Sequence, residues 1–162
     1  MPRTVGNESS TAAAEPAAET DSTPSAVASD WGAAGLTFSS GYESHSLYPV
    51  MYQVITIATE SGGTTKRVFL RGAIRKNSDS TATDFEGEVL VMGLPATVRP
   101  PATRTFVTAV YDAGGGSSRR KELHLGVSET GQMLAWGSDL ETISSALGSS
   151  LTLDGISWDT SS

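Results

Sequence analysis

Apolar and polar residues alternate with a period of two through most of the chain after Trp31, and this pattern constrains the fold more than any other feature. In the stretch KRVFLRGAIR, Val68, Leu70 and Ile74 share one side of an extended strand, and arginines occupy the other side. The stretch RRKELHLGV, residues 119–127, repeats this arrangement. Strands with one apolar side need a second layer to cover that side, so the pattern predicts stacked sheets.

Five further segments are also typical of strands, and most are bounded by glycine, proline, serine or aspartate. They are YPVMYQVITIA from Tyr48, GEVLVMGL from Gly87, RTFVTAVY from Arg104, GQMLAW from Gly131 and SLTLDGISW from Ser150. About seven short strands with frequent turn signals predict an all-β fold, either a sandwich or a barrel. We favour an antiparallel β-sandwich of the jelly-roll type. For residues 139–149 we expect either a helical turn or a loop.

The segment GLPATVRPPATRTF, residues 93–106, contains three prolines and interrupts the alternation. Proline donates no hydrogen bond to a sheet and holds the preceding residue extended. We therefore expect Pro95 to end one strand and a stiff connector, not a helix, to cross between the two sheets. Pro100 would hold Arg99 extended, either in a salt bridge or interface contact or in solvent.

Residues 1–30 differ in composition from the rest, being rich in alanine, serine, threonine, glutamate and proline and lacking aromatic residues. So little apolar surface does not offset the entropy of ordering a chain. We expect an N-terminal arm here and a folded domain at residues 31–162. The arm is either a flexible tail or an attachment segment, and in the second case Arg3, Val5 and Val27 are its candidate contact residues.

The charge and the missing cysteines exclude several classes of function. The chain of 162 residues has a formal net charge of −7 and no cysteine. A general attraction to nucleic acid or anionic lipid is disfavoured by that charge, and disulfides and thiolate chemistry are excluded. No apolar run reaches the roughly 18 residues that span a bilayer, and the N-terminus lacks the order of a secretion signal. We expect no nucleic-acid partner and no membrane insertion.

No motif predicts catalysis, a metal or a cofactor. The stretch DAGGGSS, residues 112–118, lacks the lysine of a phosphate-binding loop and suits a hairpin tip. His45 and His124 have no nearby residues that would complete a metal site. The acidic residues of 84–88 lie along one extended segment and do not face each other across a cleft. We therefore expect a protein that is not an enzyme.

Aromatic side chains outside the clear alternation either fill the core or form a binding surface. They are Trp31, Tyr42, Tyr48, Tyr52, Trp136 and Trp158. The candidate residues for a binding surface or interface are Tyr42, Tyr48, Arg99, Trp136 and Trp158.

Five short motifs occur in the order found in a known virion module. They are GLTFSSGY ending at Tyr42, RVFLRG at 67–72, LPATVRP at 94–100, Gly131, and LTLDGISW at 151–158. Together they span about four-fifths of the chain, which resembles the β-sandwich module of bacteriophage tail fibres, receptor-binding proteins and other virion-surface proteins. Thr97 and Val98 depart from that pattern, which usually has glycine and an aromatic residue there.

The resemblance implies a homotrimer on the surface of a phage particle, without cofactor. Its implied function is adhesion to a host-surface glycan as a tail-fibre or tail-tip module, with the arm attached to other virion proteins. One alternative is a capsid decoration protein or head fibre that the arm anchors to the shell. Another is a small carbohydrate-active enzyme, which would require two carboxylates facing each other across a groove.

Overall fold

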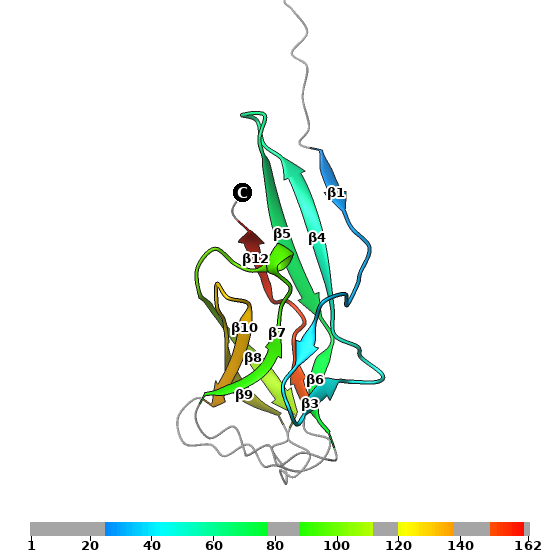
Figure 1. Ribbon diagram of the computed structural model, residues 1–162, viewed down its shortest axis with the longest axis vertical. Helices are drawn as coiled ribbons and strands as arrows, with labels where there is room; N and C mark the ends of the chain where they lie inside the picture. Colours follow the sequence, from blue (N-terminus) through cyan, green and yellow to red (C-terminus); the bar gives the residue numbers. More distant parts are fainter. Residues whose placement is uncertain (1–24, 78–87, 112–119, 138–149, 161–162) are drawn as a thin grey trace, which may run out of the picture.

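The computed structural model describes residues 25–77, 88–111, 120–137 and 150–160, and it contains twelve strands and one short 3-10 helix in these ranges (Figure 1). The elements are β1 (Ala26–Ala28), β2 (Thr37–Phe38), β3 (Tyr42–Ser44), β4 (Met51–Ala58), β5 (Thr64–Arg71), β6 (Ala73–Lys76), β7 (Val89–Gly93), η1 (Ala96–Val98), β8 (Arg104–Tyr111), β9 (Arg120–Val127), β10 (Gln132–Gly137), β11 (Ser150–Thr152) and β12 (Ser157–Thr160). All strand pairs are antiparallel, so the predicted all-β, antiparallel fold is confirmed.

Eight strands form one strongly curved sheet in the order β2-β7-β10-β9-β8-β11-β6-β3. Its first and last strands follow each other in the chain and lie in contact, so the sheet is nearly closed like a barrel. Alternate residues of β9 point inward, and Leu123, Leu125 and Val127 are fully buried as their spacing predicts. Met133 and Ala135 of β10 are buried beside them.

The second sheet has the order β1-β4-β5-β12 and covers part of the barrel. β4 and β5 pair along their whole length of eight residues, and Figure 1 shows this hairpin rising beyond the barrel with β1 along its outer edge. Val27 pairs with Thr56, and Thr160 pairs with Lys66, which is itself the partner of Thr56. The first and last described strands therefore lie at the same end of this sheet.

The chain passes from one sheet to the other at Gly72. This residue has a φ of 98°, and a Cβ atom there would lie 2.2 Å from the carbonyl oxygen of Pro49. Its amide donates a hydrogen bond to the Asp154 carboxylate at 2.8 Å. The stretch KRVFLRGAIR therefore forms two strands in different sheets, although Val68 and Ile74 are both buried as predicted.

The connector differs from its prediction in two respects. β7 and β8 belong to the same sheet, so the segment between them does not cross between sheets. It also contains the short helix η1, in which the Val98 amide donates to the Pro95 carbonyl at 3.1 Å. This turn buries Val98 against the core, a gain that a fully extended segment would not provide. Arg99 is extended before Pro100, as predicted.

Several predictions concern residues outside the described ranges. These are the turn or loop at 139–149, the hairpin tip at 112–118, and Asp84 and Glu86. Residues 25–30, which the composition assigns to the arm, include strand β1 and its pairing with β4. The folded sheet therefore begins before Trp31. Within the described ranges, no helix is long and apolar enough to cross a membrane.

Candidate functional site

Two of the predicted surface residues lie in the core. Tyr42 is 5% exposed and Trp158 is 4% exposed. The Trp158 indole Nε1 donates a hydrogen bond to the Val98 carbonyl at 2.8 Å, and its ring centroid is 6.3 Å from that of Phe106. Tyr42 and Trp158 are therefore core residues and not part of an exposed binding surface, because both side chains belong to the buried hydrophobic cluster.

Arg99 also makes its contacts within the chain. Its Nε donates to the Leu94 carbonyl at 3.2 Å, and it lies so close to Gly131 that a Cβ atom there would be 2.5 Å from Nε. Gly131 in turn accepts a hydrogen bond from the Leu94 amide at 2.8 Å. The arginine therefore links the connector to the turn before β10, and it forms no salt bridge with any residue that the structure describes.

Tyr48 is the most exposed of the five residues predicted for a binding surface or interface, and it lies on the loop between β3 and β4, which projects from the side of the molecule (Figure 1). The Tyr48 side chain is 66% exposed and the neighbouring Leu47 is 78% exposed. The loop backbone is nevertheless held in place, because the Ala73 amide donates to the Tyr48 carbonyl at 2.9 Å and the Val50 amide donates to the Ser44 hydroxyl at 2.8 Å. A fixed backbone thus presents two apolar side chains to solvent.

Polar groups surround Tyr48 in a shallow hollow of about 330 Å³. Asp154 lies on one wall, and its Oδ1 accepts the hydrogen bond from the Gly72 amide. Arg71 lies on another wall, with its guanidinium carbon 4.3 Å from the centroid of the Trp31 ring. A carboxylate and a guanidinium beside an exposed ring can hydrogen-bond to hydroxyl groups of a ligand while the ring packs on an apolar face of that ligand. We call these residues, Tyr48 with Leu47, Arg71 and Asp154, the Tyr48 site.

Trp136 lies on a second surface, the outer face of the eight-stranded sheet. Its ring stacks on His124 with a centroid distance of 5.7 Å and covers Gly126, where a Cβ atom would be 2.9 Å from the ring. The strand register places Val107 next to His124, and Val107 is 61% exposed. Leu134 and its partner Leu90 continue this face across β10 and β7. We call it the Trp136 face.

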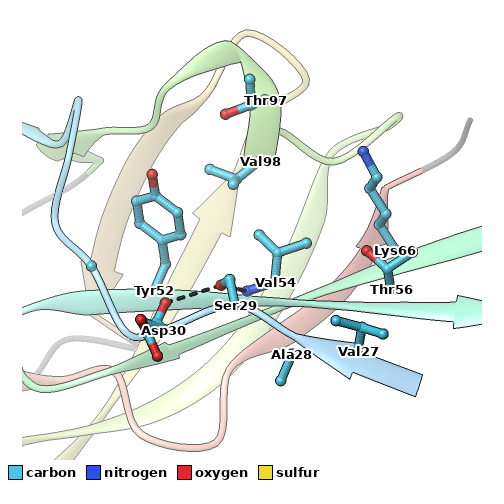
Figure 2. Close-up of a pocket in the computed structure, with 11 residues that line it drawn as sticks. Val27, Ala28, Ser29, Asp30, Tyr52, Val54, Thr56, Lys66, Thr97 and Val98 are labelled. Atoms are coloured by element: carbon cyan, nitrogen blue, oxygen red, sulfur yellow. Dashed lines mark hydrogen bonds between the residues drawn. The ribbon is translucent and has the colours of Figure 1, made fainter.

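A groove of about 540 Å³ lies between the inner face of β1, β4 and β5 and the helix η1 (Figure 2). Val27 of β1 and Val54 of β4 line its floor, and Thr97 and Val98 of η1 lie opposite. The Ser29 hydroxyl accepts a hydrogen bond from the Val54 amide at 3.0 Å, which extends the pairing of β1 beyond its last residue. Val27 is 67% exposed, while Arg3 and Val5 fall outside the described residues.

A charged cluster connects β5 and β12 beside a cleft of about 360 Å³. Arg67 and Asp159 form a two-pronged ion pair with distances of 2.7 and 3.0 Å. The hydrogen bond from Arg67 is the main reason why the pKa of Asp159 lies below its usual value, and Arg104 adds to this effect. The pKa of Arg67 is raised by the same hydrogen bond. Asp159 is thereby kept ionised and neutralises part of this arginine-rich region.

Sequence reasoning named Tyr48 and Trp136 as candidates, and the structure places both outside the core, but it missed the residues around them. Asp154 and Arg71 reach Tyr48 only because the chain changes sheets at Gly72, and no spacing in the sequence indicates this. Leu47, an isolated apolar residue in a polar stretch, was the one available signal. In the ranges that the structure describes, no group of three or more histidine, aspartate or glutamate side chains could hold a metal ion.

Comparisons with known proteins return no match for this chain. No protein-family model matches it, and no curated protein or solved structure does so either. The function proposed below therefore depends on the residues of the chain and on the motif resemblance given above.

Proposed function

We propose that this chain is a non-enzymatic surface protein of a bacteriophage particle that binds a host-surface glycan through the Tyr48 site. The order of the five sequence motifs supports the assignment to a virion-surface module. The observation that carries the binding function is the exposed Tyr48 ring on a hydrogen-bonded loop. The N-terminal residues that precede β1 attach the protein to other virion proteins.

The chemistry of the Tyr48 site supports a carbohydrate more than a peptide or a nucleic acid. The hollow is shallow, and its lining includes one acidic and one basic side chain, Asp154 and Arg71, whose charges cancel. A ligand with many hydroxyl groups can both donate to the carboxylate and accept from the guanidinium. Weak binding at each site becomes strong when several copies act together.

We further propose a homotrimer, in which the Trp136 face forms the contact between copies. Exposed or half-buried apolar side chains on β7, β10 and β8, with His124 of β9 among them, make this face suitable for packing against another subunit. Sedimentation of the purified full chain at micromolar concentration tests this, and we expect a mass that corresponds to three chains. A sedimenting species with the mass of one chain would contradict the trimer but would not bear on the proposal that Tyr48 binds a glycan.

The binding function is tested by titrating the full chain against a panel of purified bacterial envelope polysaccharides on a biosensor. For the polysaccharide that binds, Tyr48→Ala should weaken the affinity about tenfold, equivalent to about 1.4 kcal/mol. Tyr111→Ala is the matched control, because Tyr111 is also an exposed tyrosine but lies on β8. Equal affinities for Tyr48→Ala and the parent would contradict the proposal, as would new reducing ends released from the polysaccharide.

A second candidate function is capsid decoration, and one observation favours it. The first and last described strands lie at the same end of the four-stranded sheet, so anchoring at that end would let the rest of the domain project outward. Labelling the protein on intact particles and imaging the label distinguishes the two functions. Label at the tail supports adhesion, and label spread over the head supports decoration.

A further inference from the structure

Among the residues that the structure describes, no strand pairs with the outer edge of β1 and no side chain covers it. β1 is the terminal strand of its sheet, and Figure 1 shows it on the outside of the molecule. Natural edge strands are usually protected by being very short or by a charge, a proline or a bulge, because an open edge accepts another strand. β1 is short, but residues 25–29 contain no charge, proline or bulge, and all three residues of β1 are exposed. This edge is therefore open to pairing.

The hydrogen bonds to β4 identify the groups that point outward. The Ala58 amide donates to the Ser25 carbonyl at 3.0 Å, and the Ser29 amide donates to the Val54 carbonyl at 2.9 Å. Ser25, Val27 and Ser29 therefore use their backbone groups toward β4. Because successive residues of a strand point their amides in opposite directions, Ala26 and Ala28 present theirs to the open edge.

The sequence of this edge reads the same in both directions, as Ser-Ala-Val-Ala-Ser. Two copies placed antiparallel around a two-fold axis through Val27 would set Val27 against Val27, and Ala26 against Ala28. Such a contact uses the same residues on both partners, which is the property of a two-fold interface. We propose that β1 pairs with β1 of a second copy and joins their two four-stranded sheets into one continuous sheet.

This register satisfies the outward backbone groups and brings the valines together. Ala26 and Ala28 would form hydrogen-bonded pairs with about four bonds in total, and the central Val27 pair would be of the closer, non-hydrogen-bonded kind. Val27 points into the groove of Figure 2, so the grooves of the two copies would meet beneath the joined sheet. The exposed valine thereby gains a partner of the same shape.

Local charge does not oppose a second copy at this edge. The chain is acidic overall, with a net charge of −7, yet residues 25–29 are uncharged. In the antiparallel register the two Asp30 residues would lie roughly 20 Å apart. That distance exceeds the roughly 8–10 Å over which charges interact in physiological salt, so these acids do not oppose the contact.

The contact is separate from the proposed trimer, because β1 belongs to the other sheet from the Trp136 face. Pairing of two short strands gives only weak association between free chains. The pairing becomes effective when many copies are held close together on one phage particle. The two-fold contact then links neighbouring copies or neighbouring trimers. It depends neither on glycan binding nor on the trimer.

Cysteine cross-linking tests the contact directly, because the natural chain has no cysteine. In the full chain, Val27→Cys would lie opposite its own copy at a Cα separation of about 4.5 Å, which suits a disulfide. Oxidation of the purified variant should yield disulfide-linked dimers at least fivefold faster than Leu47→Cys. Leu47 is the matched control, since it is 78% exposed and Val27 is 67% exposed.

A second variant separates strand pairing from simple collision. Ala28→Pro removes a backbone amide that points away from β4, so the fold should be kept. The proposed contact between the two β1 strands would lose a hydrogen-bond donor from each copy. Adding Ala28→Pro to Val27→Cys should slow dimer formation at least fivefold, with circular dichroism unchanged. Equal rates for Val27→Cys and Leu47→Cys, or no effect of the proline in the folded protein, would overturn the proposal.

Discussion

At the scale of single residues, Trp158 connects the two sheets through one buried hydrogen bond. Its ring lies on β12, and its Nε1 donates to Val98 in the connector between β7 and β8. Trp158→Phe removes the donor, leaves the Val98 carbonyl unsatisfied in the core and reduces the packed volume. We expect the free energy of unfolding to fall by about 2–4 kcal/mol in urea titration.

Trp136→Phe is the control for that substitution, since Trp136 lies on the outer face and packs on His124. Its cost should stay below about 1 kcal/mol. Similar losses for the two variants would show that the hydrogen bond to Val98 contributes little to stability. The comparison separates a buried polar contact from surface stacking in the same residue type.

The same residues show the limits of sequence reasoning at this scale. Alternation correctly predicted that Val68, Leu70 and Leu125 are buried, because a strand with one apolar side has one arrangement that covers it. It could not distinguish the buried Trp158 from the exposed Tyr48. That difference depends on which loop projects beyond the sheets, and such a loop is positioned by hydrogen bonds between distant segments.

At the scale of elements, the chain passes from one sheet to the other at Gly72, and a substitution there tests how much stability depends on this crossing. Gly72→Ala would place a Cβ atom against the Pro49 carbonyl in a backbone conformation that disfavours side chains. We expect a loss of at least about 3 kcal/mol in the free energy of unfolding, because left-handed strain adds to a clash with backbone. Chemical denaturation of the purified variant measures this loss.

Gly62→Ala provides the matched comparison. Gly62 also has a positive φ, of 81°, but no atom lies within 4 Å of the position of its Cβ. Its cost should be about 1–2 kcal/mol, which is the strain of the left-handed backbone alone. The difference between the two variants then reports the close approach of Pro49. A Gly72→Ala variant as stable as Gly62→Ala would contradict this account.

Strands were easier to predict than the segments between them. Seven segments were predicted as strands, and each contains at least one strand, because alternation and local propensity agree there. The connector with three prolines was predicted to cross between sheets, and this was wrong. Proline restricts the local backbone but carries no information about which sheet receives the next strand.

At the scale of the whole molecule, the N-terminal residues meet the fold at β1, at the end of the four-stranded sheet where Thr160 also lies. Composition alone placed the boundary of the arm at residue 30, but the sheet already includes Ala26–Ala28. Three exposed residues carry too weak an apolar signal to be recognised as a strand. Their pairing depends on the long edge that β4 offers.

Two deletions therefore separate attachment from stability. Removing residues 1–24 keeps β1, so we expect a melting temperature within about 2 °C of the parent. Removing residues 1–30 also takes away β1 and the hydrogen bonds of Ser29 to Val54, which leaves the edge of β4 open. The melting temperature should then fall by about 5 °C or more, as monitored by circular dichroism.

If the arm is the attachment segment, both truncated proteins should fail to join phage particles. Only the protein that lacks residues 1–30 should also be less stable than the parent. Quantifying each protein on purified particles completes the comparison. Normal incorporation of the chain lacking residues 1–24 would show that those residues are not the anchor. Attachment would then have to involve the folded domain, in which the edge of β1 and the groove beneath Val27 are formed by the first described residues of the chain.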